Sequence, residues 1–189
     1  MTIIAAAIKN GKVSISCDSQ TNFGSLKVRS KYRKHSHKLL EVNDSVIGVT
    51  GWTATTQILE HLIKTEPQIF KLKKKWDIFE MLLSLQEKLK DDYYIETQED
   101  SDQPVESNQL DGLIINSKGI FKFASYREVE QFTKFWAIGS GRSFALGAMH
   151  SLDKKNVSAK EISEAGVTAA SEFDDSCDLP LKTIIMDLE

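Results

Sequence analysis

The sequence predicts an α+β fold in which sheets and helices form separate layers. Runs of strand patterns alternate with pairs of helix patterns, and a single strand pattern ends the chain. Strands grouped in this way favour antiparallel sheets covered by helices over alternating βαβ units. The length of 189 residues is enough for one domain with a substantial core and is short for two. We therefore expect a single domain over residues 1–189.

The first fifty residues predict two β-hairpins. The turn Asn10-Gly11 is the strongest hairpin signal, because both residues tolerate positive φ, and Asn43-Asp44 marks the second turn. The first return strand ends at Asp18, so a hairpin would bring Asp18 close to the start of the chain. The expected strands are residues 2–8, 13–17, 38–42 and 45–49.

Two pairs of helices are predicted from apolar residues at helical spacing. The first helix, 53–64, stops before Pro67, and Asp77 with Glu80 forms a capping pair that opens the second, 78–89. Ser158 and Glu161 form a capping box for a helix that reaches about residue 173, and residues 144–149 form the helix before it. Core-facing residues of the first pair are Ala54, Ile58, Leu59, Leu62, Ile63, Ile78, Phe79, Leu82, Leu83, Leu85 and Leu89.

The remaining segments are strands and one polar insertion. Residues 91–108 are acidic and polar and contain a proline, which indicates a surface loop or insertion. A turn at 116–119 joins two further strands. The expected strands in this half of the chain are residues 110–115, 120–124, 135–138 and 181–188.

Composition gives no overall attraction to nucleic acid or to an anionic membrane. Lys and Arg total 24 against 27 Asp and Glu, a formal charge of -3. The basic segment 27–38 is interpreted as a solvated loop, because it has no interleaved aromatic residues beyond Tyr32. Without a signal peptide or long apolar run, the chain is expected in the cytoplasm, with Cys17 and Cys177 as reduced, buried thiols.

Thr2 directly follows Met1 and is a candidate nucleophile. Methionine is usually removed when the next side chain is small, and removal would leave a hydroxyl and a free α-amine on one residue. An α-amine has a pKa of about 7.7 to 8.0, so at neutral pH a useful fraction can accept the hydroxyl proton. N-terminal threonine is a known form of activated nucleophile. Many chains begin Met-Thr without catalytic use, so the pair needs support from other motifs.

Four segments in order supply that support: Thr-Ile-Ile at 2–4, Cys-Asp-Ser-Gln-Thr at 17–21, Asn-Asp-Ser-Val-Ile-Gly-Val-Thr-Gly at 43–51 and Trp-Ala-Ile-Gly-Ser-Gly at 136–141. Together they resemble the proteasome β-subunit family, most closely the bacterial HslV-type and related small proteasome-like proteins. The resemblance runs from residue 2 to about 176, interrupted chiefly at 91–108. It implies a four-layer αββα sandwich of the N-terminal-nucleophile hydrolase type, assembled into stacked homo-oligomeric rings.

The resemblance also implies site residues. Thr2 matches the nucleophile, Asp18 the acidic residue, and Lys38 the lysine that precedes an apolar strand ending in Asn. Lys34 is the alternative to Lys38, because the loop before this strand is longer than usual. A nearby ammonium lowers the pKa of the hydroxyl and the amine, and the carboxylate holds that ammonium in place.

Three more matches complete the implied site. Gly51 matches the glycine whose backbone N–H stabilises the oxyanion, although a tryptophan follows where the family usually has a second glycine. Ser140 matches a serine near the threonine amine, and Asp174 a later aspartate of the same network. Ser176 and Cys177 compete for the family's final hydroxyl position.

The resemblance implies a threonine peptidase that acts, after removal of Met1, on peptides or unfolded proteins inside the ring, with no metal or cofactor. The chain has no Gly-x-x-x-x-Gly-Lys-Ser/Thr motif, so an ATPase unfoldase partner would be a separate protein. Two alternatives stay open. One is a non-catalytic ring or scaffold subunit, although such α-type subunits normally carry an extra segment before the first strand. The other is an N-terminal-nucleophile amidase acting on small amides.

Overall fold

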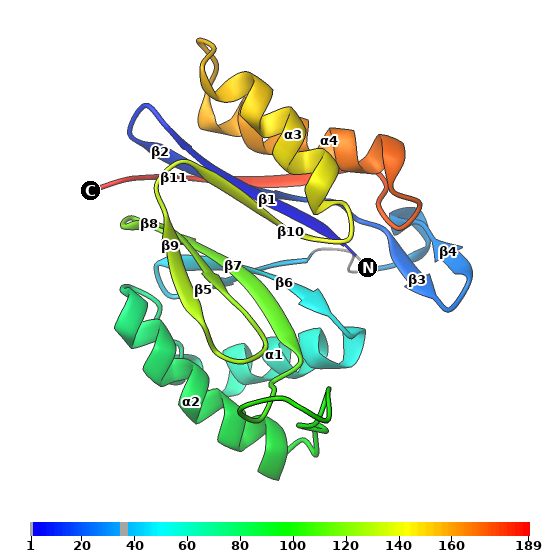
Figure 1. Cartoon of the computed structure of the whole chain (residues 1–189), viewed down its shortest axis with the longest axis vertical. Helices are drawn as coiled ribbons and strands as arrows, with labels where there is room; N and C mark the ends of the chain where they lie inside the picture. The colour runs from blue at the N-terminus through cyan, green and yellow to red at the C-terminus, as the bar shows by residue number, and fades with distance from the viewer. Residues whose placement is uncertain (1, 35–37) are drawn as a thin grey trace.

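A computed structural model of the protein describes residues 2–34 and 38–189. Its two main sheets are antiparallel and lie face to face, with a pair of helices on the outer face of each (Figure 1). This arrangement is the predicted four-layer αββα sandwich. No helix in the described part of the chain is both long and apolar enough to cross a membrane.

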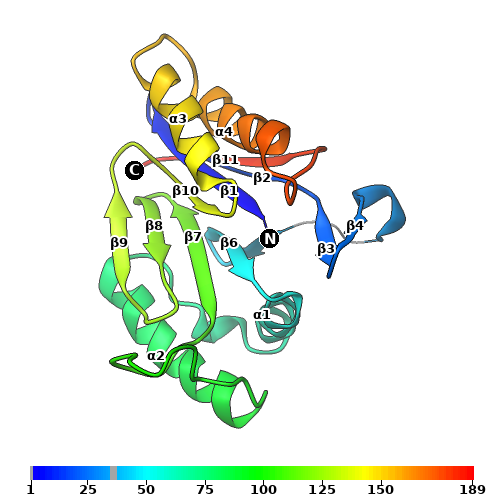
Figure 2. The same ribbon diagram turned by 45° about the vertical axis from the view of Figure 1, so that its right-hand side comes forward.

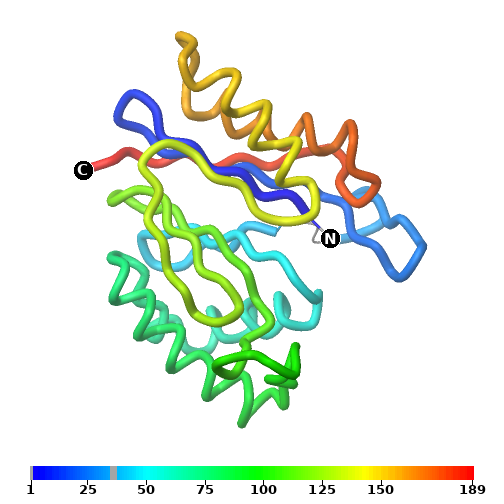
Figure 3. The backbone as a smooth tube through the Cα atoms, viewed as in Figure 1, coloured from blue at the N-terminus to red at the C-terminus, as the bar shows by residue number. Residues whose placement is uncertain are grey.

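The first sheet has four strands in the order β10-β1-β2-β11. Asn10 and Gly11 have φ angles of 51° and 73° and form the predicted turn between β1 and β2. The start of β1 and the end of β11 lie at opposite ends of the sheet (Figure 3). The strands are β1 Ile3–Lys9, β2 Lys12–Cys17, β10 Phe135–Gly139 and β11 Lys182–Asp187.

The second sheet has five strands in the order β5-β6-β7-β8-β9. The predicted turn at Asn43 is confirmed, with a φ of 52°. β9 was not predicted, because it is a short edge strand whose two central residues are charged or polar and exposed. The strands are β5 Leu39–Val42, β6 Ser45–Gly51, β7 Leu110–Asn116, β8 Gly119–Phe123 and β9 Val129–Phe132.

The helices are α1 Thr53–Thr65, α2 Lys75–Asp91, α3 Arg142–Asp153 and α4 Ala159–Phe173. The capping box of Ser158 and Glu161 is confirmed at the start of α4. The predicted cap of α2 is wrong, because this helix starts at Lys75 and Asp77 lies inside its first turn. Burial of Ile78 and the residues after it stabilises the earlier start, and an acid in the first turn favours the helix dipole.

Three layers of apolar side chains hold the sandwich together. One core cluster lies between α1, α2 and the second sheet, and another between α3, α4 and the first sheet. The central cluster joins the two sheets and includes Ile4, Ile15, Val46, Leu113 and Ile138. Most of the predicted helix stripes lie in or against the first of these clusters, but Leu83 is 45% exposed.

A small hairpin, β3 Thr21–Phe23 and β4 Leu26–Val28, projects beside the sandwich and is followed by a 3-10 turn, Ser30–Tyr32 (Figure 2). The sequence predicted only a loop here, because the segment lacks an alternating apolar pattern. Part of that predicted loop, residues 35–37, lies outside the described residues. A second short 3-10 turn, Pro67–Ile69, joins α1 to the segment before α2.

Replacing Leu113 tests the contact between the sheets. Leu113 is fully buried, so Leu113→Ala should lower the free energy of unfolding by about 2–5 kcal/mol through lost burial and a cavity. Leu83→Ala in α2 is the matched control and should change it by less than about 0.5 kcal/mol. Urea unfolding at equal protein concentration measures both, and equal losses would contradict the assignment.

Candidate active site

The ends of four strands bring the predicted site residues together. Thr2 precedes β1 and Asp18 follows β2, and the pairing of Ile4 with Cys17 makes them neighbours. Lys38 precedes β5 and Gly51 ends β6 in the second sheet. Thr2, Lys38 and Gly51 line one cavity of about 390 Å³ at this edge of the sandwich.

A buried ion pair lies beside this cavity. The Nζ of Lys38 is 2.6 Å from Oδ1 of Asp18, and the side chains are 11% and 0% exposed. A carboxylate and an ammonium removed from water in this way are stable only as a pair, because each alone would carry a desolvation cost of several kcal/mol. Lys34 also lines the cavity, but the lysine that pairs with Asp18 is Lys38.

Asp18 is held by backbone donors as well as by Lys38. Its Oδ1 also accepts the N–H of Ile3 at 3.0 Å, and its Oδ2 accepts the N–H of Gln20 at 3.0 Å and that of Asp178 at 3.4 Å. Donors on both oxygens fix the side chain in one orientation. Because Ile3 follows Thr2 directly, Asp18 connects the lysine to the residue next to the candidate nucleophile.

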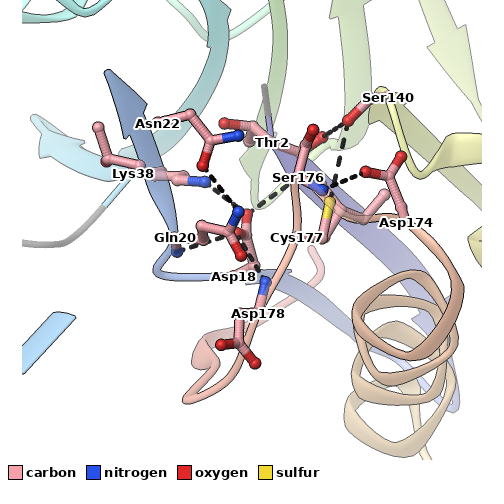
Figure 4. Close-up of polar contacts among 12 residues, drawn as sticks. Thr2, Asp18, Gln20, Asn22, Lys38, Ser140, Asp174, Ser176, Cys177 and Asp178 are labelled. Atoms are coloured by element: carbon pink, nitrogen blue, oxygen red, sulfur yellow. Dashed lines mark hydrogen bonds and ion pairs between the residues drawn. The ribbon is translucent and has the colours of Figure 1, made fainter. Parts of the chain in front are cut away.

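Ser140 and Cys177 lie on the other side of Thr2 from Lys38 (Figure 4). The Oγ of Ser140 donates to the backbone carbonyl of Thr2 at 3.5 Å and lies 3.9 Å from Sγ of Cys177. Ser176 donates its hydroxyl to Asp175. Of the two residues predicted for the final hydroxyl position, the one in contact with Ser140 is Cys177.

Both cysteines are free and buried. Burial, with the negative charges of Asp18 and Asp174, raises the pKa of Cys177 to about 12. Burial also raises the pKa of Cys17 to about 11. Both thiols therefore stay protonated at neutral pH and are poor nucleophiles.

Asp174 caps the end of α4 and shapes the loop that carries Cys177. Its Oδ1 accepts the N–H of Ser176 at 2.8 Å, and its backbone carbonyl accepts the N–H of Cys177 at 3.1 Å. The contacts of Asp174 within its own loop make it a support for the position of Cys177. Asp174 is half-buried and is not among the residues that line the cavity of about 390 Å³.

Two glycines shape the backbone around Thr2. Gly51 has a φ of 134°, lines both the main cavity and a second one of about 250 Å³, and carries no side chain to block them. Gly139 has a φ of 104°, and a Cβ there would lie 1.9 Å from the carbonyl oxygen of Thr2. In the sequence, Gly139 is part of the Gly-Ser-Gly motif at 139–141, from which no role for it was predicted. Its nearness to Thr2 comes from the pairing of β10 with β1, which no spacing in the sequence reveals.

Gln20 is a second residue that the sequence did not single out. It is buried, and its Nε2 donates to Asn22 at 2.7 Å and to the carbonyl of Asp175 at 2.9 Å. These bonds tie the segment after Asp18 to the loop after α4. The one sequence signal for Gln20 was its position two residues after Asp18, because a single buried glutamine belongs to no recognisable motif.

A four-layer αββα sandwich with a polar cavity at the start of its first strand is the architecture of an N-terminal-nucleophile hydrolase. Residues 1–186 match the protein family described as Proteasome subunit. The chain belongs to the proteasome subunit family. That membership supports a peptidase of the N-terminal-nucleophile type that works within a ring-shaped oligomer.

Solved structures agree with this membership. Thiobacillus denitrificans BPH is 34% identical, with a TM-score of 0.92 and coverage of 99% of this chain and 98% of that one. The structure of Thiobacillus denitrificans BPH in complex with epoxomicin is 32% identical, with a TM-score of 0.89 and 99% of each chain covered. Eukaryotic HslV from Trypanosoma brucei shares the fold at 19% identity, with a TM-score of 0.74 and coverage of 98% and 99%. A comparison with curated proteins found no match.

The contact between Gly139 and Thr2 can be tested with a matched glycine. Gly139→Ala and Gly119→Ala both force alanine into positive φ, at 104° and 122°, which costs about 1–3 kcal/mol. Only at Gly139 would the new Cβ overlap the Thr2 carbonyl, because the nearest atom at Gly119 is 3.4 Å away. We expect Gly139→Ala to lower the free energy of unfolding, measured in urea, by at least about 1 kcal/mol more than Gly119→Ala does.

Hydrogen exchange supplies the second measurement for these variants. Faster exchange of the peptide containing residues 2–9 is expected in Gly139→Ala and not in Gly119→Ala. Equal exchange in this segment would show that Gly139 does not position the start of β1.

Proposed function

We propose that the protein is an N-terminal threonine peptidase that hydrolyses peptide bonds inside a ring of identical subunits. The observation that carries the proposal is the position of Asp18. One of its oxygens accepts from both the Lys38 ammonium and the Ile3 amide, so a buried cation is fixed beside Thr2. Removal of Met1, which lies outside the described residues, would free the α-amine of Thr2.

The reaction follows from two groups on one residue. Oγ of Thr2 attacks the carbonyl carbon of the peptide, and its proton passes to the α-amine. The carbonyl oxygen takes the negative charge, which the N–H of Gly51 stabilises. Return of the carbonyl breaks the C–N bond, and the α-ammonium gives its proton to the leaving amine. Water then attacks the resulting ester, with the α-amine again as base, and releases the acid and free Thr2.

The surrounding residues have supporting roles in this reaction. The Lys38 ammonium lowers the pKa of the Thr2 hydroxyl by favouring its anionic form, and Asp18 holds the ammonium in place. Ser140 holds the Thr2 carbonyl from the other side. Asp174 positions the loop of Cys177, so its effect on the reaction is indirect.

Assembly and substrate follow from the family. Rings would enclose the cavities, so short peptides and unfolded chains are the proposed substrates, with a separate ATPase as a partner that could unfold proteins. The location typical of the family, the cytosol, is proposed for this chain as well. The relative from Thiobacillus denitrificans was solved with epoxomicin, and this compound is the proposed inhibitor here.

Thr2→Ala tests the nucleophile. Loss of the hydroxyl should reduce hydrolysis of a panel of fluorogenic peptides by at least about a thousandfold, because the oxygen that forms the ester in the proposed reaction is removed. Thr2→Ser is the matched control and should keep measurable activity, since serine retains the hydroxyl and the α-amine. Epoxomicin should inhibit the wild type.

Intact mass of the same preparations distinguishes the alternatives. Loss of Met1 together with turnover that depends on Thr2 supports the peptidase. Retention of Met1 without turnover would favour a non-catalytic ring subunit, and turnover of small amides but not of peptides would favour an amidase.

A pair of lysine variants decides which lysine acts. Lys38→Met should remove at least about 99% of turnover, and Lys34→Met should keep most of it, because the lysine held by Asp18 is Lys38. Lys38→Met also leaves a buried carboxylate unpaired, which costs about 3–5 kcal/mol of stability. Turnover is therefore compared per folded subunit, with circular dichroism as the check. Full activity of folded Lys38→Met would contradict the proposed role.

A further inference from the structure

Charge is divided between two segments that the proposed chemistry does not use. Residues 21–34, here called the basic hairpin, contain five cations and no acid: Lys27, Arg29, Lys31, Arg33 and Lys34. Residues 96–106, here called the acidic loop, contain five acids and no base: Glu96, Glu99, Asp100, Asp102 and Glu106. All of these residues are exposed except Arg33, which is half-buried.

The two segments do not neutralise each other within one chain. The basic hairpin projects beside the first sheet, whereas the acidic loop lies near the end of α2, with α1 between them in both views (Figures 1 and 2). Over residues 2–34 and 38–189, no ion pair joins the two segments. Each segment therefore keeps most of its charge for a partner outside the chain.

Several of these charges are unpaired among the described residues. Glu99, Asp100 and Asp102 have no ion pair there, although Asp100 and Asp102 accept weak hydrogen bonds from Ser101. Lys31 lies 5.0 Å from the centre of the Tyr32 ring and has no acidic partner. Glu106, by contrast, forms a salt bridge with Lys90.

Each segment also shifts the pKa of a neighbouring residue: the positive hairpin lowers one pKa, and the negative loop raises another. Lys27, which is 3.0 Å from Asp178, holds the pKa of that carboxyl below its usual value, with help from Arg29. Burial and the negative charges of Glu99 and Asp100 raise the pKa of Tyr126. The hairpin is thus a positive surface and the loop a negative one.

Hydrogen bonds within the acidic loop hold its backbone. Oε1 of Gln103 accepts the N–H groups of Glu99 and Asp100, and its Nε2 donates to the carbonyls of Thr97 and Val105. A loop fixed by its own hydrogen bonds loses little conformational entropy on binding. The backbone that carries Glu99 and Asp100 is therefore held in place.

Exposed apolar side chains accompany the charges. Phe23, Leu26 and Tyr32 are 60%, 68% and 75% exposed in or next to the basic hairpin, and Tyr94 and Val105 are exposed in or next to the acidic loop. Aromatic contacts within a charged, solvated rim are typical of specific protein interfaces.

We infer that the basic hairpin of one copy docks on the acidic loop of the neighbouring copy. The inference rests on the proposed ring assembly and names the surfaces that form it. Because the two surfaces differ and lie at separate places, their contact is head-to-tail, which closes into a ring when the rotation allows. Thr21, Asn22 and Arg33 line the main cavity, so this contact lies beside the candidate active site.

Charge reversal in the full-length protein tests the inference. Arg29→Glu/Lys31→Glu puts like charges at the contact, and so does Glu99→Lys/Asp100→Lys, so each should raise the subunit concentration needed for assembly at least about tenfold. The chain with all four substitutions restores opposite charges and should assemble again. Lys154→Glu/Lys155→Glu, at the exposed turn between α3 and α4, is the matched control and should assemble as the wild type.

Sedimentation velocity at low and high salt measures assembly, and circular dichroism confirms folding. The inference is overturned if folded single-segment variants assemble normally, or if the four-substitution chain does not recover. Loss of oligonucleotide binding in Arg29→Glu/Lys31→Glu with unchanged assembly would assign the hairpin to nucleic acid instead. A monomeric wild type would overturn the ring as well, and peptide hydrolysis by Thr2 is scored separately.

Discussion

The ion pair between Asp18 and Lys38 is the contact on which the candidate site depends, because it joins the two sheets at the edge where Thr2 lies. Asp18 directly follows strand β2 of the first sheet, and Lys38 directly precedes strand β5 of the second. A buried pair of this kind contributes little net stability, since desolvation offsets most of the attraction. Its value is geometric: neither charge can leave its partner without the full cost of burial, so the distance between the sheet edges is fixed.

Thr2 is positioned from both sides by contacts to its backbone. Asp18 accepts the amide of Ile3 on one side, and Gly139 comes close to the carbonyl of Thr2 on the other, a contact that requires a residue without Cβ. Ser140 donates to the same carbonyl. These contacts fix the backbone from which the Thr2 side chain projects, which suits a residue whose hydroxyl and amine are both proposed to react.

Short-range signals account for the parts of the fold that the sequence could predict. Asn10-Gly11 and the capping box at Ser158 specify a turn and a helix start through their own backbone geometry, and both are confirmed. The edge strand β9 and the start of α2 depend on packing against neighbouring elements, so local patterns could not locate them. For the site, motifs located Asp18 and Lys38, and the structure pairs them. The role of Gly139 required the three-dimensional approach of two strands, which no spacing in the chain encodes.

The separation of charge on the surface has a physical consequence for the cavity. Thr21 and Asn22, at the base of the basic hairpin, line one side of the cavity. The hairpin forms a separate sheet of two strands, and a sheet of this size has little stability of its own. Its main charged anchor is the contact of Lys27 and Arg29 with Asp178, whose amide also donates to Asp18. A neighbour bound to the hairpin would therefore act on the same loop that holds the buried carboxylate. In the proposed assembly, Asp178 would link the contact between copies to the geometry around Thr2, because it contacts both the basic hairpin and Asp18.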